Sequence, residues 1–183
     1  NFATPETGKT YHNVGVLVGF ANNKDGKLNV DNVIVKGDIK VDAPQTFGVG
    51  AIVGYSYREM GAITNTKVLA NAGSYIKGER FVGGITGYSY NNAIIDNCTV
   101  ENLALTGEIG VGGIAGLALN GNKIARCTVK DVTVNGEKNV AYIVGELGSG
   151  DGGNVTVADN CNAPQPWVGG SYGTGESFVA TIG

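Results

Sequence analysis

Residues 82–88 read Val82-Gly83-Gly84-Ile85-Thr86-Gly87-Tyr88, and this stretch decides the fold because the chain repeats it. A related heptapeptide, with valine first, an aliphatic residue fourth and glycine sixth, begins at Val14, Val49, Val111 and Val140. Successive starts lie 35, 33, 29 and 29 residues apart. Spacings of this size are typical of solenoids, in which each repeat is one structural unit that stacks on the next.

The aligned copies keep the same residue type in several columns, and a side chain that is buried in every copy is expected to do so. One aliphatic column holds Leu17, Ile52, Ile85, Ile114 and Ile143, and another holds Val35, Val68, Val100 and Val129. Leu103 and Leu105 match Val132 and Val134 at the strand period of two, and no segment has a helical period. A column of glycines, and clusters of Asn and Asp, lie between these segments. These residue types tolerate positive φ or a close approach of another backbone, so they predict corners of the coil. That glycine column comprises Gly19, Gly54, Gly87, Gly116 and Gly145.

This pattern of short strands and corners predicts an all-β fold, a parallel β-helix or β-solenoid of about five turns stacked about 4.8 Å apart. The predicted organisation is a leader or N-terminal cap over 1–13, five repeats over 14–161, and a C-terminal cap or partial sixth repeat over 162–183. A β-sandwich is the alternative, because its strands also come at regular short spacing. A sandwich does not explain why five copies keep the same columns.

Composition excludes several classes of protein. The 183 residues suffice for one domain, with 13 basic and 16 acidic side chains, a net charge of −3 and no basic cluster, so nucleic acid is not an expected partner. The 31 glycines have no three-residue period, which excludes collagen. No apolar run is long enough to span a membrane, so membrane attachment is expected only through parts outside this sequence. Because the chain begins at Asn1 and its only methionine is Met60, we expect a piece of a longer precursor.

The glycine motif is similar to that of a known family. Gly84-Ile-Thr-Gly87 and Gly113-Ile-Ala-Gly116 resemble the Gly-Leu-any-Gly signature of GLUG repeats, while Val16, Ala51 and Tyr142 replace the leading glycine in the other copies. The resemblance covers about residues 14–161. It implies a secreted or surface-attached bacterial protein, such as an adhesin-like or IgA-peptidase-type chain, and it brings no catalytic residues.

Two polar columns lie at one predicted corner. Asn32, Asn65, Asn97 and Asn160 share a column that Arg126 interrupts, and stacked amides there predict a structural asparagine ladder. The next column contains all three cysteines, Cys98, Cys127 and Cys161. Buried free thiols are favoured for it, with a disulfide between neighbouring turns or a reactive or metal-binding thiol as alternatives.

A metal site and an active site are both disfavoured by the residue pattern. Asn23, Asp25 and Asn29 fit the middle of an EF-hand or dockerin calcium loop, but the loop lacks its first and last carboxylates, so a solvated turn is predicted and no metal or cofactor is expected. The candidate acids Asp31, Asp96 and Asp159 share a column with the neutral residues Thr64 and Ala125. The single histidine, His12, lies in the leader. We therefore predict no catalytic residues.

The ligand-contact candidates are aromatic. Tyr55 and Tyr88 follow the glycine motif on adjacent turns, and Tyr57 and Tyr90 lie two residues further on. Amphipathic rings suit contacts with sugars or proteins, although the rings alternatively stack on one another and cover the strands.

We therefore expect a non-enzymatic, secreted or cell-surface bacterial repeat domain, attached to the outer membrane in the surface case. Its expected role is adhesion, with a glycan or a host-surface protein as the partner. A passive structural spacer and a polysaccharide-active β-helix enzyme are the alternatives.

Overall fold

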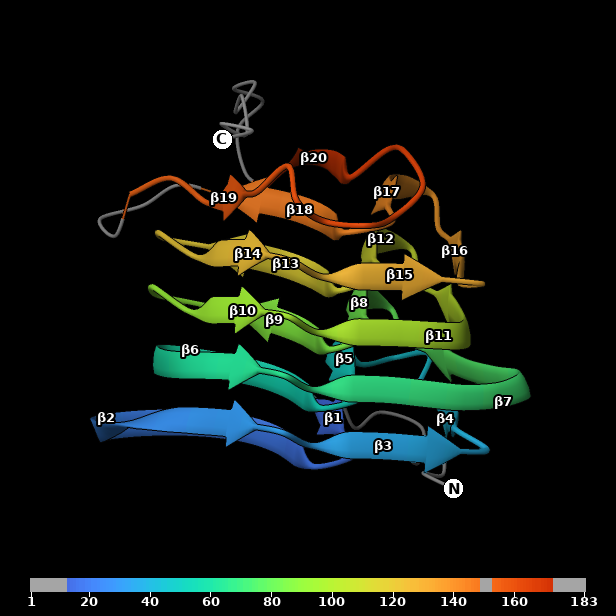
Figure 1. The fold of residues 1–183 in the computed structure, drawn as a ribbon, viewed down its shortest axis with the longest axis horizontal. Helices are drawn as coiled ribbons and strands as arrows, with labels where there is room; N and C mark the ends of the chain where they lie inside the picture. The colour runs from blue at the N-terminus through green and yellow to red at the C-terminus, as the bar shows by residue number, and fades with distance from the viewer. Residues whose placement is uncertain (1–12, 149–152, 173–183) are drawn as a thin grey trace.

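The protein is described by a computed structural model that covers residues 13–148 and 153–172. These residues form a β-solenoid of about four turns and contain no α-helix, and their strands stack in parallel along the coil axis (Figure 1). The predicted parallel β-solenoid is confirmed, and the predicted five turns are close to the observed number. The sandwich alternative is wrong because the strands of each sheet come from successive turns.

The strands of the described residues form three sheets. Sheet 1 runs in the order β1 (Val14–Gly15), β5 (Phe47–Gly50), β8 (Arg80–Gly83), β12 (Ile109–Gly112) and β17 (Lys138–Ala141). Sheet 2 contains β2 (Val18–Asp31), β6 (Val53–Thr64), β9 (Thr86–Ser89), β10 (Ile94–Asp96), β13 (Ala115–Leu119), β14 (Lys123–Ala125), β18 (Val144–Gly148), β19 (Thr156–Val157) and β20 (Val168–Ser171). Sheet 3 contains β3 (Ile34–Gly37), β4 (Lys40–Asp42), β7 (Lys67–Lys77), β11 (Thr99–Thr106), β15 (Thr128–Lys130) and β16 (Thr133–Asn135).

The strand register follows the repeat alignment of the sequence. Val49 pairs with Val14 on one side and with Val82 on the other, and Val111 pairs with Val82 and Val140. The five heptapeptide starts are therefore neighbours in sheet 1. The partial sixth copy also joins the stack, because β20 pairs in parallel with β18. Of the predicted leader, residues 1–12 lie outside the described part of the chain.

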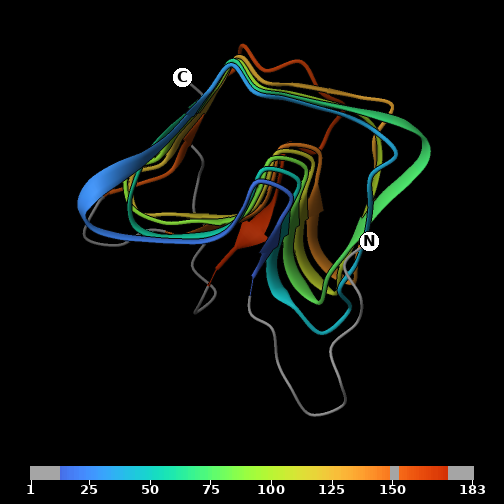
Figure 2. The ribbon, with the colours of Figure 1, turned by 90° about the horizontal axis from the view of Figure 1, so that it is seen from below.

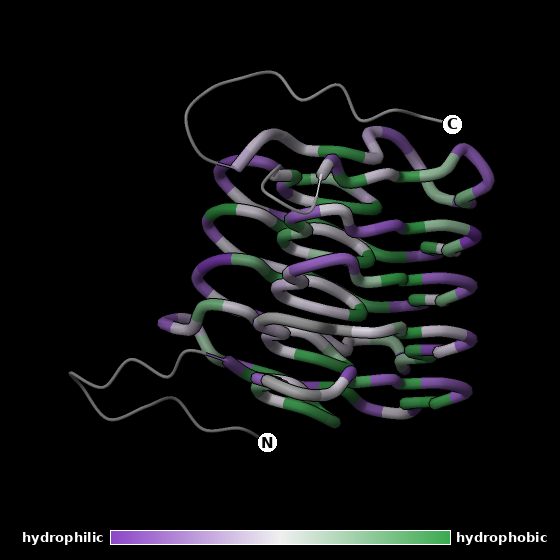
Figure 3. The backbone as a smooth tube through the Cα atoms, turned by 90° about the vertical axis from the view of Figure 1, so that its left-hand side faces the viewer, coloured by the Kyte–Doolittle hydropathy of each residue, from purple (hydrophilic) through white to green (hydrophobic). Residues whose placement is uncertain are grey.

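The aliphatic column forms the centre of the core. Ile52, Ile85, Ile114 and Ile143 have no exposed surface, whereas Leu17 in the first turn is 52% exposed. Figure 3 shows apolar segments at corresponding places on successive turns. An inward side chain is thus covered by the turns on both sides of it, and Leu17 is open because it belongs to the end turn of the described stack.

Each turn contains a sharp inward reversal, which we call the β-arch: a sheet 1 strand, the reversal and the start of the following sheet 2 strand (Figure 2). The glycine column lets the sheet 2 arm of one turn approach the sheet 1 arm of the preceding turn. A Cβ at Gly87 would lie 2.3 Å from the nitrogen of Val49, and one at Gly116 would lie 2.3 Å from the carbonyl carbon of Phe81. Close approach of two backbones, rather than positive φ at a corner, therefore explains this column.

The corners are made by the asparagine column. Asn32, Asn65 and Asn97 have φ between 51° and 56°, in the left-handed region that asparagine tolerates better than most residues. Arg126 adopts the same conformation with φ of 51°. Within the described residues there is also no helix long and apolar enough to cross a membrane.

Candidate functional site

The four predicted tyrosines lie together on sheet 2. Tyr55 on β6 pairs with Phe20 on β2 and with Tyr88 on β9, so three rings stand on three successive turns. The ring centroids of Phe20 and Tyr55 are 5.3 Å apart at an interplanar angle of 22°, and those of Tyr55 and Tyr88 are 4.3 Å apart at 27°. Both pairs are stacked.

A second stack runs beside the first. The centroids of Tyr57 and Tyr90 are 5.5 Å apart at 24°, and Tyr90 meets Tyr88 edge to face at 6.3 Å. We call these five residues the aromatic strip: Phe20, Tyr55, Tyr57, Tyr88 and Tyr90. Ring stacking, which the sequence left as an alternative to ligand contact, is present, while the four tyrosines remain only half-buried.

The hydroxyls of Tyr55 and Tyr88 are held in their neutral form. The hydroxyls of Tyr55 and Tyr88 interact with each other, and burial is the largest cause that raises the pKa of Tyr88 far above its usual range. Burial also raises the pKa of Tyr55. Since neutral phenols both donate and accept hydrogen bonds, these groups keep both capacities at physiological pH.

Phe81 joins the strip from the other arm of the arch, and the sequence analysis missed it. Its ring centroid lies 5.6 Å from that of Tyr88, and it packs with Leu117 in a small apolar cluster separate from the main core. Phe81 has φ of 55° in a column that also holds Asn13, Gly48, Gly110 and Asn139, and the last three of these have positive φ. A bulky residue in the left-handed region is strained. One phenylalanine among Gly and Asn residues was therefore the feature of the sequence that could have marked position 81 as a functional candidate.

A buried carboxyl group lies two turns beyond Tyr88 in the same column. Glu146 continues the column of Tyr88 and Leu117 and is 3% exposed. Asn139 Nδ2 donates a hydrogen bond to Glu146 Oε1 at 2.5 Å. Glu146 Oε2 is buried without a hydrogen-bond partner among the described residues. Burial raises the pKa of Glu146, while the bond from Asn139 and the guanidinium of Arg80 act in the opposite direction. Sequence reasoning missed this group because its partners come from other columns.

The asparagine ladder is shorter than predicted. Asn97 Nδ2 donates to Asn65 Oδ1 at 2.7 Å, but Asn65 Nδ2 continues to the carboxylate of Asp31 at 2.9 Å rather than to Asn32. Asn160 Oδ1 accepts a hydrogen bond from the backbone nitrogen of Arg126 at 2.9 Å. The column therefore fastens neighbouring corners through mixed polar contacts.

The aspartates of the neighbouring column, Asp31 and Asp96, also form hydrogen bonds or an ion pair at this corner. Thr64 and Asn65 donate to Asp31 and lower its pKa, with the Thr64 bond as the largest cause. The guanidinium of Arg126 forms an ion pair with Asp96. A further ladder, which sequence reasoning missed, joins Asn120 Nδ2 to Asn91 Oδ1 at 2.9 Å.

Of the three weak metal candidates, the structure describes the side chain of Asn29 alone. Asn29 Oδ1 accepts a hydrogen bond from the backbone nitrogen of Ala62 at 3.0 Å. The side chains of Asn23 and Asp25 lie outside the described part of the structure. Among the described residues, no group of three or more His, Cys, Asp or Glu side chains is arranged to hold a metal ion.

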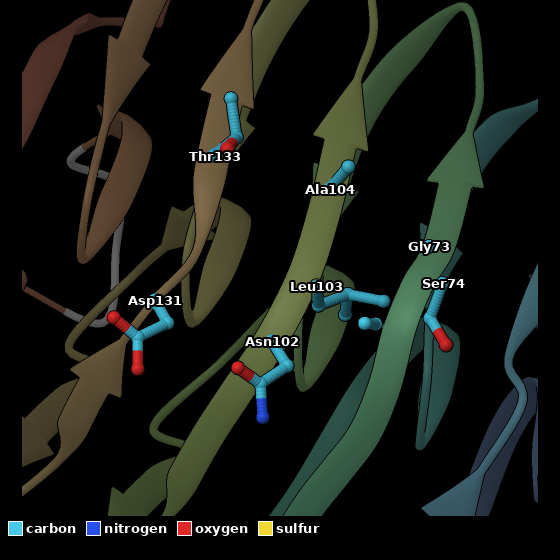
Figure 4. Close-up of a pocket in the computed structure, with 8 residues that line it drawn as sticks. Gly73, Ser74, Asn102, Leu103, Ala104, Asp131 and Thr133 are labelled. Atoms are coloured by element: carbon cyan, nitrogen blue, oxygen red, sulfur yellow. The ribbon is translucent and has the colours of Figure 1, made fainter.

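A shallow depression of about 220 Å³ lies on sheet 3, away from the strip. It occurs where β11 has a register shift between Glu101 and Leu103, and Asn102 and Asp131 at this corner have positive φ. Figure 4 shows the polar side chains of Asn102 and Asp131 on neighbouring turns beside it. The depression has few apolar groups to hold a ligand, so the aromatic strip remains the candidate site.

Comparison with known proteins finds the glycine motif. Residues 82–106 match the family described as the GLUG motif. No curated protein and no solved structure matches the chain. The matched residues span β8 to β11, which is one turn including its β-arch, and the same motif positions recur in register in the neighbouring turns. This match and the fold together support a GLUG-repeat protein.

Proposed function

We propose that this chain is a non-enzymatic recognition module of a secreted or cell-surface bacterial repeat protein, and that its aromatic strip binds a glycan. The observation that carries the proposal is the pair of ring stacks on successive turns, which remain partly exposed on one face. Aromatic side chains with a polar tip are the residues that binding surfaces use most for contact at low entropic cost.

The strip is periodic, which favours a polymeric ligand. Tyr57 and Tyr90 occupy corresponding places on adjacent turns, and adjacent turns of a parallel stack are about 4.8 Å apart. A row of phenol groups at a regular spacing matches a chain that presents hydroxyl groups repeatedly. Since the stacked rings cover one another's faces, the ligand would contact ring edges and phenol oxygens.

The acids of the repeat support a non-enzymatic role. Asp31 accepts bonds from Thr64 and Asn65, and Asp96 is paired with Arg126. Both carboxylates are thus engaged in holding successive corners together. A passive spacer is the second candidate, and mutual ring stacking favours it because the contacts of the strip are also satisfied without a ligand.

The test is binding to an array of bacterial and host glycans and to mucins before and after deglycosylation. The double variant Tyr57→Phe, Tyr90→Phe keeps both rings and removes both hydroxyls, so it should keep its melting temperature and lose most of the binding. Asp131→Ala on sheet 3 is the matched surface control and should bind like the wild type.

Other outcomes contradict the proposal in different ways. No binding by the wild-type protein would favour the spacer. Binding that survives deglycosylation would indicate a polypeptide ligand, and full binding by the Tyr57→Phe, Tyr90→Phe variant would exclude the phenol groups as the contact.

A further inference from the structure

The three cysteines form a column of free, buried thiols on successive turns. Cys98 and Cys127 have no exposed surface, and Cys161 is 7% exposed. Their neighbours fix the register: Thr99 pairs with Thr128, and Thr128 forms a parallel bridge with Asn162. Each cysteine directly precedes one of these paired residues, so the three thiols follow one another along the coil axis.

Cys127 is the central thiol of the column. Its Sγ donates to the carbonyl oxygen of Ala125 at 3.3 Å, and Cys98 Sγ donates to that of Ile63 at 3.4 Å. The interaction with Cys127 lowers the pKa of Cys161 to about 7, and the interactions with the thiols of Cys161 and Cys98, together with burial, raise the pKa of Cys127. Cys161 is therefore the thiol that ionises most readily, and at 7% exposed it is the least buried of the three.

Geometry limits which thiols are able to pair. Cys98 and Cys161 are two turns apart, roughly 9.6 Å at the parallel strand spacing, which exceeds the Cα separation of a disulfide. Any disulfide within this column must therefore contain Cys127.

The backbone distinguishes the two possible partners of Cys127. The residues before Cys98 and Cys127, Asn97 and Arg126, share a φ of 51°, so these two cysteines have the same local backbone and their Cβ atoms stay near the strand spacing of about 4.8 Å. Disulfides need Cβ atoms about 3.5–4.5 Å apart. Asn160, before Cys161, does not have a positive φ, and Cys161 lies in an irregular segment after β19, so its local backbone differs from that of the other two cysteines.

We propose that Cys127 and Cys161 are an oxidation site. A small disulfide of the glutathione type oxidises them, the resulting Cys127–Cys161 disulfide joins the two turns, and Cys98 stays reduced. The Cys161 thiolate attacks the small disulfide, forms a mixed disulfide and releases one small thiolate. Cys127, losing its proton to that thiolate, then attacks Cys161 Sγ and releases the second thiolate, which takes a proton from solvent. Two protein thiols and one small disulfide thus become one protein disulfide and two small thiols.

This site is independent of the aromatic strip. The bond would join positions 127 and 161 across 34 residues of chain and fasten the segment after β19 to the turn below it. A cross-link of this kind restricts the unfolded chain more than the folded one, so the melting temperature of the oxidised protein should rise.

The test is incubation of the folded protein with oxidised glutathione, followed by thiol counting under denaturing conditions and peptide mapping. The count should fall from three thiols to one. Trypsin places the cysteines on separate peptides, 81–123, 127–130 and 139–183, and a link between the last two is expected. A count that stays at three, a link that contains 81–123, or a link only between two molecules would overturn the proposal.

Two serine variants keep the test informative if one of them folds poorly. Cys98→Ser should form the same link at the wild-type rate, because Cys98 takes no part. Cys161→Ser should retain both remaining thiols under the same conditions. Rapid loss of both thiols in Cys161→Ser would show that the site is Cys98 and Cys127 instead, and slow oxidation of Cys98→Ser would show that Cys98 is required.

Discussion

Ile114 tests the core at the scale of a single residue. It has no exposed surface and belongs to the aliphatic column, so Ile114→Asp places an unpaired carboxylate among apolar side chains. We expect a loss of unfolding free energy of at least about 4 kcal/mol, enough to unfold the domain. Leu17→Asp is the matched control, because Leu17 holds the same column but is 52% exposed, and it should cost less than about 1 kcal/mol. Urea unfolding curves of the two variants measure the difference, and equal losses would contradict the proposed column.

Glu146 makes stability depend on pH. Burial raises its pKa in the folded protein above the ordinary value of 4.5, so the folded state binds this proton more tightly than the unfolded chain does. Its contribution to the unfolding free energy is therefore complete below about pH 4.5 and is lost as the pH rises through the folded pKa. Asp31 acts oppositely: its pKa is lowered, so its contribution is present above its ordinary pKa of 3.8 and is lost in more acidic solution.

The variant Glu146→Gln isolates this dependence. It removes the titrating group while keeping the shape, so we expect higher stability than the wild type at pH 8 and a flatter pH profile above pH 4.5. Urea unfolding at a series of pH values checks the result. A wild-type profile that rises steadily from pH 5 to 8, with the same slope in the variant, would mean that Glu146 is ionised without cost in the fold.

At the scale of the element, the β-arch depends on glycine because its sheet 2 arm touches the sheet 1 arm of the preceding turn through the backbone. Gly116→Ala would place a Cβ 2.3 Å from the carbonyl carbon of Phe81 and 2.5 Å from the nitrogen of Val82, and both are backbone atoms. We expect a loss of at least about 3 kcal/mol. Gly19→Ala in the same column meets only the Asn13 oxygen at 3.3 Å and should cost less than about 1 kcal/mol. Thermal unfolding measures both, and similar melting temperatures would indicate that the arms separate easily.

The strands and their register could be predicted from the sequence, but the β-arch could not. Repetition made the prediction possible, because Ile52, Ile85 and Ile114 recur at the same place and the register follows from alignment of the copies. The glycine column was ambiguous, since glycine serves both at a turn and at a close approach of two chains. A single sequence does not show which backbone lies opposite Gly116.

The candidate site at the scale of the whole molecule was predicted only in part. The tyrosines were found because their spacing repeats, so stacking of turns brings Tyr55 beside Tyr88. Phe81 and Glu146 each depart from their column in one copy, and their contacts join different columns of the coil. Contacts of that kind depend on how the turns fold inward, which the repeat pattern does not contain.

The whole molecule should tolerate the loss of a complete turn, because each turn contacts mainly its neighbours. Deletion of residues 82–110 joins Phe81 to Val111 and removes 29 residues, so Val111 takes the place of Val82 beside Val49 and every later column keeps its register. We expect a folded β-solenoid with a single cooperative transition and a lower melting temperature, since one interface between turns is gone. Circular dichroism and thermal unfolding measure both properties.

Deletion of residues 82–109 is the control for that shorter solenoid. It leaves Gly110 as one additional residue before Val111, which displaces the following arm by one position and turns its inward side chains outward. This variant should lose cooperative unfolding, although it keeps more of the chain than the 29-residue deletion does. Similar behaviour of the two deletions would mean that stability does not depend on register between turns, and the description of the molecule as a stack of equivalent units would then be wrong.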